Sequence, residues 1–352
     1  MFFGNKTITA VDIGSYAIKA VKMRAGKNGL NIITAGSRIL PEKAVNQGEI
    51  QDYAVVSRIL KDVLEEINGS KYIITAVPGK NLIIRNMEMP LISEEELTEA
   101  IKWEADDYLP FPVEQAMFDY ILLSKDEENM SVLLVAAERK TINGLVKIFD
   151  NIGLKPAVIN AQPMALISLL KIQGLVDDTV ALVDAGASGT RVIIGDGKNI
   201  YLSRNIDIGG NHFTETLMES RNLEFSEAEE YKRKEGLAAD DQNDNSAGFT
   251  DLTTTGLVKT LSALADSLAG EISRSLEYYF MKYKDNDLDK IFFTGGCSRL
   301  KGLDRVISEE TGVTVVSIDP FEYFDFETWG EGAPGFSVAV GLGASEVLGN
   351  EN

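Results

Sequence analysis

The sequence predicts an α/β protein built from two similar lobes, because one pattern of strands and turns occurs twice. A strand expected at 7–12 ends on Asp12 and is followed by a turn rich in glycine and serine. A strand expected at 179–184 ends on Asp184 and is followed by a turn of the same kind. Such self-similarity is the mark of a duplicated architecture. A chain of 352 residues is long enough for two lobes with cores of their own.

The first copy is expected to run β-β-β-α-β. Apolar and β-branched residues between glycine and asparagine predict its strands, and apolar residues at helical spacing predict its helix. These elements are strands at 7–12, 16–24 and 30–38, a helix at 52–67 and a strand at 72–78.

A small α+β module is expected at 81–156, between the two copies. Ser93 and Glu96 predict a capping box at the start of its first helix, and the prolines of LPFP end that helix. Two strands and a further helix complete the module, at 116–124, 131–137 and about 140–151.

The second copy repeats the three strands and then adds helices. Ser226 and Glu229 predict a second capping box, and the polar segment 238–250 predicts a loop. The expected elements are strands at 179–184, 190–195 and 198–206, helices at 225–237 and 251–283, a strand with a glycine turn at 290–300, and a final strand or helix at 335–349.

Composition excludes several classes of function. A formal net charge of −20 argues against a large nucleic-acid footprint, because phosphate binding needs a basic face. One cysteine, Cys297, and one histidine, His212, cannot build a disulfide framework or a zinc site, and the histidine is expected to be structural. No apolar run is long enough to span a membrane, and MFFGNK leads directly into a strand without a signal peptide. We therefore expect a cytoplasmic protein.

The two repeated turns predict a phosphate site. No P-loop is present, because each Gly-Lys pair is followed by asparagine. Two turns facing each other across a cleft would instead present backbone N–H groups to a polyphosphate. Asp12 and Asp184 would repel each other there unless a cation lay between them, and water-bound magnesium suits that position. Gly14 and Gly186 would let the backbone approach the phosphates closely. Ser15 and Ser188 would add hydroxyl donors, and Lys19 would add a positive charge. The alternative is two ordinary hairpin turns.

A third glycine turn, in the segment TGGCSR, predicts contacts with a nucleoside. Gly295 and Gly296 would let the nucleoside approach the backbone, and Arg299 could stack on an adenine. Glu229 and Lys232 lie three apart on one helix face and could clasp a ribose. The alternative for this last pair is a solvated ion pair.

These motifs, in this order, resemble the actin/Hsp70/sugar-kinase ATPase superfamily over essentially the whole chain. DIGSYAIK is similar to its first phosphate motif, DAGASGT to the second, TGGCSR to the adenosine motif, and NAQPMAL and AVGLGAS to the two connecting motifs. The resemblance implies an actin-like, ribonuclease H-like duplicated two-lobed ATPase fold. The inserted module is similar to subdomain 1C of FtsA. EAIKWEADDYLPFP and FFGNKTITAVDIGSYAIKAVKM resemble the PilM family of type IV pilus assembly.

Together with the expected elements, the resemblance implies four subdomains. Lobe I (1A) would comprise 1–80, 157–178 and 326–352, with 81–156 as the 1C insertion. Lobe II would comprise 179–212 and 286–325 (2A) and 213–285 (2B).

The resemblance also implies a role for each matching residue, with ATP and Mg²⁺ as ligands. Asp12 and Asp184 would hold the magnesium through water. Gln162 falls where the superfamily orients the attacking water, and because an amide is a poor base we expect a weak Mg-dependent ATPase at most. The phosphates would be surrounded by Gly14, Ser15, Tyr16, Lys19, Gly186, Ala187, Ser188 and Gly189, and the nucleoside by Glu229, Lys232, Gly295, Gly296 and Arg299. Tyr16 is bulkier than the family pattern, and Ala187 is less permissive than glycine.

The PilM resemblance implies an ATP-binding adaptor at the inner face of the cytoplasmic membrane. It would bind the N-terminal cytoplasmic tail of PilN in a groove between the first lobe and the inserted module. Trp103, Tyr108 and Phe111 would either line this surface or fill the core of the module. Membrane contact would be indirect, through PilN. Further expected partners are pilus motor ATPases, other platform proteins and other copies of the chain.

Two other functions stay open on the sequence. The first is a polymerising cytoskeletal ATPase of the FtsA/MreB kind, although FtsA is expected to carry a C-terminal membrane-targeting helix that is absent here. The second is a sugar or acetate kinase. A kinase needs a second substrate site and a catalytic base, and the motif order shows no aspartate for that base.

Overall fold

The computed structural model describes residues 6–26, 29–176, 178–237, 252–284, 288–324, 326 and 330–348. The segment 238–250, for which the sequence predicts a loop, lies outside them. The chain divides into two compact units: Met1–Thr179 with Ile193–Ser203 and Pro320–Asn352, and Val180–Val192 with Arg204–Asp319.

The first unit is built on a five-stranded sheet in the order β10-β6-β1-β2-β3. β1 pairs antiparallel with β2, and β2 with β3, whereas β1, β6 and β10 run parallel. The strands are β1 (Lys6–Ile13), β2 (Ala17–Gly26), β3 (Gly29–Ile39), β6 (Ile73–Val77) and β10 (Pro156–Ala161), with a small hairpin of β4 (Val45–Asn46) and β5 (Glu49–Ile50).

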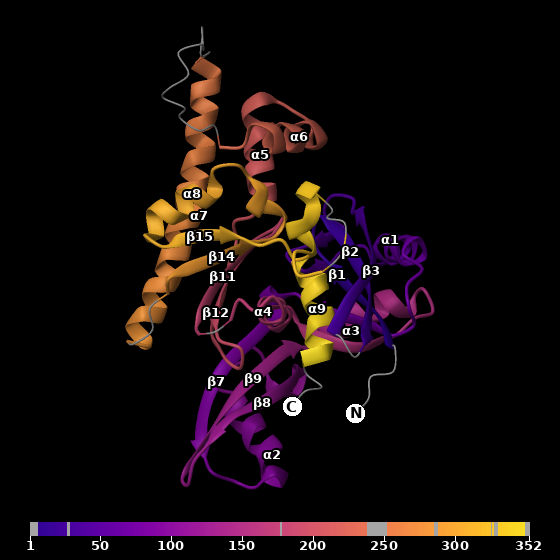
Figure 1. Cartoon of the computed structure of the whole chain (residues 1–352), viewed down its shortest axis with the longest axis vertical. Coiled ribbons are helices and arrows are strands. Elements are labelled where there is room, and N and C mark those ends of the chain that lie inside the picture. Colours follow the sequence, from indigo (N-terminus) through magenta and orange to yellow (C-terminus); the bar gives the residue numbers. More distant parts are fainter. Residues whose placement is uncertain are drawn as a thin grey trace. The chain divides into compact units, whose positions relative to one another are not determined.

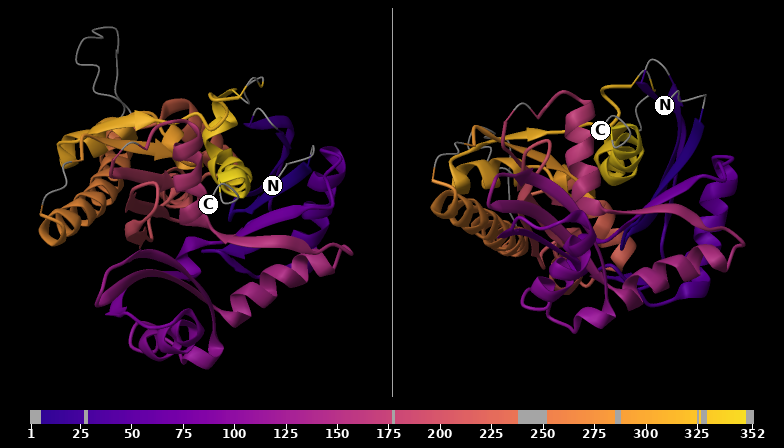
Figure 2. Two further views of the ribbon diagram at one scale, coloured as in Figure 1. Left: turned by 60° about the horizontal axis from the view of Figure 1, so that its bottom comes forward. Right: turned by 90° about the horizontal axis from the view of Figure 1, so that it is seen from below.

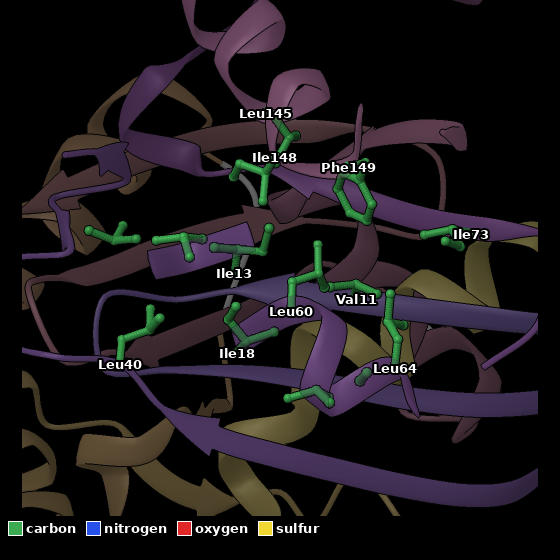
Figure 3. Packing of buried hydrophobic residues seen from close by; sticks show 14 of the residues in the cluster. Val11, Ile13, Ile18, Leu40, Leu60, Leu64, Ile73, Leu145, Ile148 and Phe149 are labelled. Carbon is green, nitrogen blue, oxygen red and sulfur yellow. The ribbon is translucent and has the colours of Figure 1, made fainter. Parts of the chain in front are cut away.

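Helices α1 (Tyr53–Glu66) and α3 (Arg139–Asp150) contribute to the core cluster of this sheet. Asp52 caps α1, because its side chain accepts a hydrogen bond from the N–H of Val55. The apolar face of each helix meets strand residues such as Val11 and Ile18, as Figure 3 shows. The core of the first unit therefore packs around the strands on either side of the Asp12 turn.

Two further helices of the first unit, α4 (Gln162–Ile172) and α9 (Ser337–Leu348), pack against each other and against β6 (Figure 1). The helical form of α9 settles the choice between strand and helix that the sequence left open. Gly341 makes the close approach of α4 and α9 possible: a Cβ there would lie 2.7 Å from the carbonyl carbon of Ala165. A backbone neighbour of this kind cannot move aside.

Gly341→Ala is therefore expected to lower the free energy of unfolding by about 1–3 kcal/mol, the usual cost of overpacking. Gly343→Ala is the matched control in the same helix, because its Cβ would meet the end of the Met23 side chain, a flexible group. The measurement is denaturant unfolding of both variants. Equal losses of stability would contradict the close-approach explanation.

The inserted module consists of a three-stranded sheet, in the order β7-β9-β8, and one helix. The strands are β7 (Leu82–Pro90), β8 (Ala116–Lys125) and β9 (Asn129–Glu138), and the helix is α2 (Glu94–Ala105). Figure 2 shows α2 lying against one face of this sheet. Its core combines Leu97 and Ile101 of α2 with alternate residues of β9, such as Val132 and Leu134.

The second five-stranded sheet has the order β13-β12-β11-β14-β15, which matches the order of the first sheet strand for strand. Parts of β12 and β13 fall within Ile193–Ser203 of the first unit, and the rest of the sheet belongs to the second unit. β11, β14 and β15 run parallel, as β1, β6 and β10 do. The strands are β11 (Val180–Ala185), β12 (Thr190–Gly195), β13 (Ile200–Ile206), β14 (Lys290–Thr294) and β15 (Thr314–Ser317). The helices are α5 (Gly210–Arg221), α6 (Phe225–Glu235), α7 (Leu252–Lys282) and α8 (Leu303–Thr311). The duplication predicted from the two aspartate turns is therefore confirmed.

Local details differ from the sequence predictions at the helix ends. The capping box of α6 is formed by Glu224 and Glu227, so the prediction of Ser226 and Glu229 is wrong. The helix begins at Phe225, and the Glu227 carboxylate accepts a hydrogen bond from the N–H of Glu224 at 3.2 Å. Ser93 is the N-cap of α2, but its hydroxyl donates to the carboxylate of Glu96 at 2.8 Å instead of capping the backbone.

Candidate nucleotide-binding site

The first predicted phosphate turn lies between β1 and β2 in the first unit. Its backbone is closed by a hydrogen bond from the N–H of Gly14 to the carbonyl of Ala17, at 3.1 Å. Asp12 and Lys19 are register partners across the hairpin, and Lys19 Nζ lies 3.5 Å from Asp12 Oδ2. Both side chains are largely withdrawn from solvent. The pairing places one negative and one positive charge side by side at the turn.

Two other predicted residues of the first unit have backbone partners. The carbonyl of Tyr16 accepts a hydrogen bond from the N–H of Leu40 at 2.8 Å, so the bulky residue sits in a fixed turn. Gln162 is the first residue of α4, and its Oε1 accepts a hydrogen bond from the N–H of Gly79 at 3.1 Å. The contact holds the Gln162 amide in one orientation. The proposed role in orienting water stays a prediction.

The second predicted phosphate turn follows β11 in the second unit. Asp184 is the last residue but one of that strand, with only 8% of its surface exposed. The N–H of Gly186 donates to the carbonyl of Gly189 at 2.9 Å. The first residues of α5 are tied to the same turn, because Gly210 N donates to Gly186 O and Asn211 N to Ala187 O. The turn is therefore rigidly attached to the start of a helix.

Asp184 and Gly295, assigned by sequence to the metal and to the nucleoside, lie next to each other. β11 and β14 are paired with Asp184 opposite Thr294. Gly295 has a φ of +90°, and a Cβ there would lie 2.5 Å from Asp184 Oδ1. Only glycine fits this position. Arg299 closes a short 3₁₀ turn, Gly296–Arg299, and the following helix, α8, begins at Leu303.

Glu229 and Lys232 form a largely buried network rather than a solvated ion pair. Lys232 Nζ donates to Glu229 Oε2 at 2.5 Å, to Gly210 O at 2.9 Å and to Thr214 Oγ1 at 2.8 Å. Thr214 in turn donates to Glu229 at 2.7 Å. An ammonium has three N–H donors, and three protein acceptors match them. Lys232 therefore holds the Glu229 carboxylate in place.

Burial opposes ionisation of Glu229, but the charge and hydrogen bonds of Lys232 and Thr214 outweigh it and lower the pKa of the carboxyl below 4.5. A lowered pKa stabilises the fold above the ordinary pKa, and this stability is lost as the pH falls through the lowered value. Glu229→Gln is therefore expected to reduce the loss of unfolding free energy on acidification below about pH 4.5. Denaturant unfolding across this range checks it, with Glu230→Gln, an exposed position on the same helix, as control. An unchanged pH slope in Glu229→Gln would contradict the coupling.

Two residues of this region, Thr214 and Gly210, carry little sequence signal for the roles they have. Thr214 and Gly210 enter the Lys232 network only because α5 packs against α6. Nδ1 of His212 accepts a hydrogen bond from the N–H of Gly209 at 3.1 Å, which is the structural role predicted for the single histidine. Burial raises the pKa of the Cys297 thiol to about 11, so this cysteine is an unreactive core residue.

The described part of the chain has neither a direct metal-binding cluster nor a membrane-spanning helix. No group of three or more His, Cys, Asp and Glu side chains is arranged there to hold a metal ion directly. None of the helices described is both long and apolar enough to cross a bilayer. The water-mediated magnesium site at Asp12 and Asp184 stays a prediction.

The duplicated sheets and the aspartate turn that follows the first strand of each define the actin-like ATPase fold. MreB 5 of Spiroplasma citri, solved bound to AMPPNP, shares this fold with a TM-score of 0.57 and 13% identity, over 99% of this chain and 98% of that one. Within this class, the chain belongs to the type IV pilus assembly protein PilM family, whose model matches residues 10–343.

Two further relatives agree with this assignment. A solved PilM-PilN type IV pilus biogenesis complex is similar with a TM-score of 0.82 and 25% identity, over 98% of this chain and 99% of that one. Cell division protein FtsA of Bacillus subtilis is 22% identical over 269 residues, which is 68% of this chain. The match spans 60% of the length of FtsA.

Proposed function

We propose that this chain is an ATP-binding adaptor of the type IV pilus assembly platform that binds the N-terminal cytoplasmic tail of PilN. The observation that carries the proposal is the similarity to a PilM-PilN complex over nearly the full length of both chains. The adaptor would lie at the cytoplasmic face of the inner membrane and reach the membrane only through PilN.

A surface on the inserted module suits an extended tail. β8 is an edge strand of its sheet, so its outer backbone groups can pair with a peptide. Met117 and Ile121 of β8 are 38% and 41% exposed, on the sheet face that also carries Ala137. Ala137 packs into the core of the first sheet. These exposed apolar residues therefore lie on the face by which the module joins the rest of the first unit.

The test of this function is a titration of a synthetic PilN tail peptide, with and without MgATP. Ile121→Lys is expected to abolish binding, because it places a charge on the apolar face. Leu122→Lys is the matched control: the neighbouring residue is 40% exposed but points to the opposite face of the strand. A lack of peptide binding by the unmodified protein in either nucleotide state would overturn the adaptor function.

Nucleotide would be held by residues from each unit. In the first unit, Asp12 would hold water-bound magnesium, and Lys19 with the turn Gly14–Tyr16 would bind phosphate. In the second unit, Asp184 would share the metal, the turn after it would bind phosphate, and Glu229, Gly295, Gly296 and Arg299 would bind the nucleoside. Magnesium supplies charge neutralisation at the phosphates when bound. Gln162 offers only an amide to water, so we expect slow hydrolysis or none.

The second candidate function is a polymerising ATPase, which the similarity to FtsA favours. Filament formation on addition of ATP, measured by pelleting and electron microscopy, would support it. A protein that stays monomeric with ATP and binds the tail peptide would instead support the adaptor.

A further inference from the structure

Trp103 is the most exposed large apolar side chain in the part of the chain that the structure describes, with 80% of its surface accessible. It lies on α2, whose buried residues Leu97, Ile101 and Ala105 recur every fourth position and face the module sheet. Trp103 is two residues from Ile101, about 200° around the helix. The indole therefore points away from the core of the module, and it is absent from the cluster that forms this core.

The surroundings of Trp103 on the helix are strongly acidic. Seven carboxylates and one lysine occur between Glu94 and Asp107. Glu99 lies four residues before Trp103 on α2, which places it beside Trp103 on the outer surface. Asp107 is exposed in the turn that follows the helix. The carboxylates of Glu99, Glu104 and Asp107 have no ion pair or hydrogen bond within the part of the chain that the structure describes. The outer face of α2 thus combines an accessible indole with uncompensated negative charge.

This surface differs from the one proposed for the PilN tail. The residues of β9 that face α2, such as Val132 and Leu134, alternate with Leu133 and Ala137 on the opposite face of the sheet. Met117 and Ile121 share the face of Ala137 and Leu133. Trp103 is therefore separated from the edge-strand surface by the thickness of the module, as Figure 2 illustrates for α2.

We propose that the outer face of α2 is a second docking surface, which binds a cationic segment of a partner protein. An arginine or lysine of that segment stacks on the Trp103 indole, and neighbouring basic residues pair with Glu99, Glu104 and Asp107. A guanidinium over an indole is the strongest common cation–π pair, and surrounding carboxylates raise the local concentration of cations. Charge complementarity selects this occupant, because an apolar helix or an anionic membrane would bring its surface against the carboxylates of Glu99, Glu104 and Asp107.

The probe is a fluorescently labelled peptide of alternating arginine and glycine, titrated into the full chain at low salt. An alternating glutamate–glycine peptide is the negative control. We expect saturable binding that weakens steeply as salt rises from about 0.05 to 0.5 M, because screening shortens the reach of surface charges. Trp103→Ala should weaken binding by about fivefold, and Glu99→Lys with Asp107→Lys should abolish it.

A charge-matched control separates a specific surface from the overall negative charge of the chain. Asp62→Lys with Glu65→Lys makes the same change in net charge on the exposed face of α1. This variant should bind the arginine peptide as the unmodified protein does. Equal losses in both double variants, or unchanged binding in Trp103→Ala, would overturn the proposal. The PilN tail titration gives a separate readout, because Trp103→Ala should leave that binding unchanged.

Discussion

Asp12→Ala is expected to lower the affinity of the protein for MgATP about 10- to 100-fold, because the variant lacks the carboxylate proposed to hold water-bound magnesium. This is the usual cost of removing a group that acts on a metal through an intervening ligand. The effect should depend on magnesium. Asp12 also lies 3.5 Å from Lys19, and its removal leaves the lysine charge available to phosphate. In the presence of EDTA, the variant should therefore bind ATP at least as well as the unmodified protein.

Isothermal titration with and without magnesium measures both parts of this expectation. Asp62→Ala, on the exposed surface of α1, is the control for losing one aspartate from the first unit. Thermal unfolding of each variant shows whether the fold is kept. Unchanged affinity of a folded Asp12→Ala protein for MgATP would mean that the first aspartate turn is only a structural hairpin.

Gly295→Ala is expected to destabilise the second unit and abolish nucleotide binding together. Any side chain at a φ of +90° is strained. The added Cβ would also lie 2.5 Å from Asp184 Oδ1 and would push the carboxylate out of its position. The combined cost is about 2–5 kcal/mol of unfolding free energy. Because Asp184 is buried and held by its surroundings, the displacement should reach the predicted magnesium position as well.

The neighbouring glycine provides the control. A Cβ at Gly296 would meet nothing within 4 Å, so Gly296→Ala should keep the stability of the unmodified protein. Denaturant unfolding and ATP titration are measured for both variants. The comparison separates the effect of the strained position of Gly295 from the effect of replacing any glycine in this turn. If Gly296→Ala were as unstable as Gly295→Ala, the close approach to Asp184 would not be the cause.

Much of the site could be predicted because its signals are local. An aspartate at the end of a buried strand, followed by a glycine turn, is readable at Asp12 and again at Asp184. The repeat of that pattern predicted two sheets, and both sheets have the same strand order. Periodicity likewise placed α1 within a residue of its ends.

Other features depend on which elements meet in space. Glu229 and Lys232 read as a surface pair because they lie three apart on a helix, yet α5 covers them and supplies Gly210 and Thr214. Trp103, which the sequence left between module core and surface, is exposed because Leu97, Ile101 and Ala105 already occupy the buried face of α2.

The sequence by itself determined the duplicated α/β architecture, the inserted module and the positions of the aspartate turns, because strand patterning and turn chemistry act over a few residues. Only the tertiary structure decided that Gly295 adjoins Asp184, that Lys232 holds Glu229, and that the two faces of the module differ. These relations join residues far apart in the chain. They arise from the pairing of β11 with β14 and from the packing of helices, which no local pattern specifies.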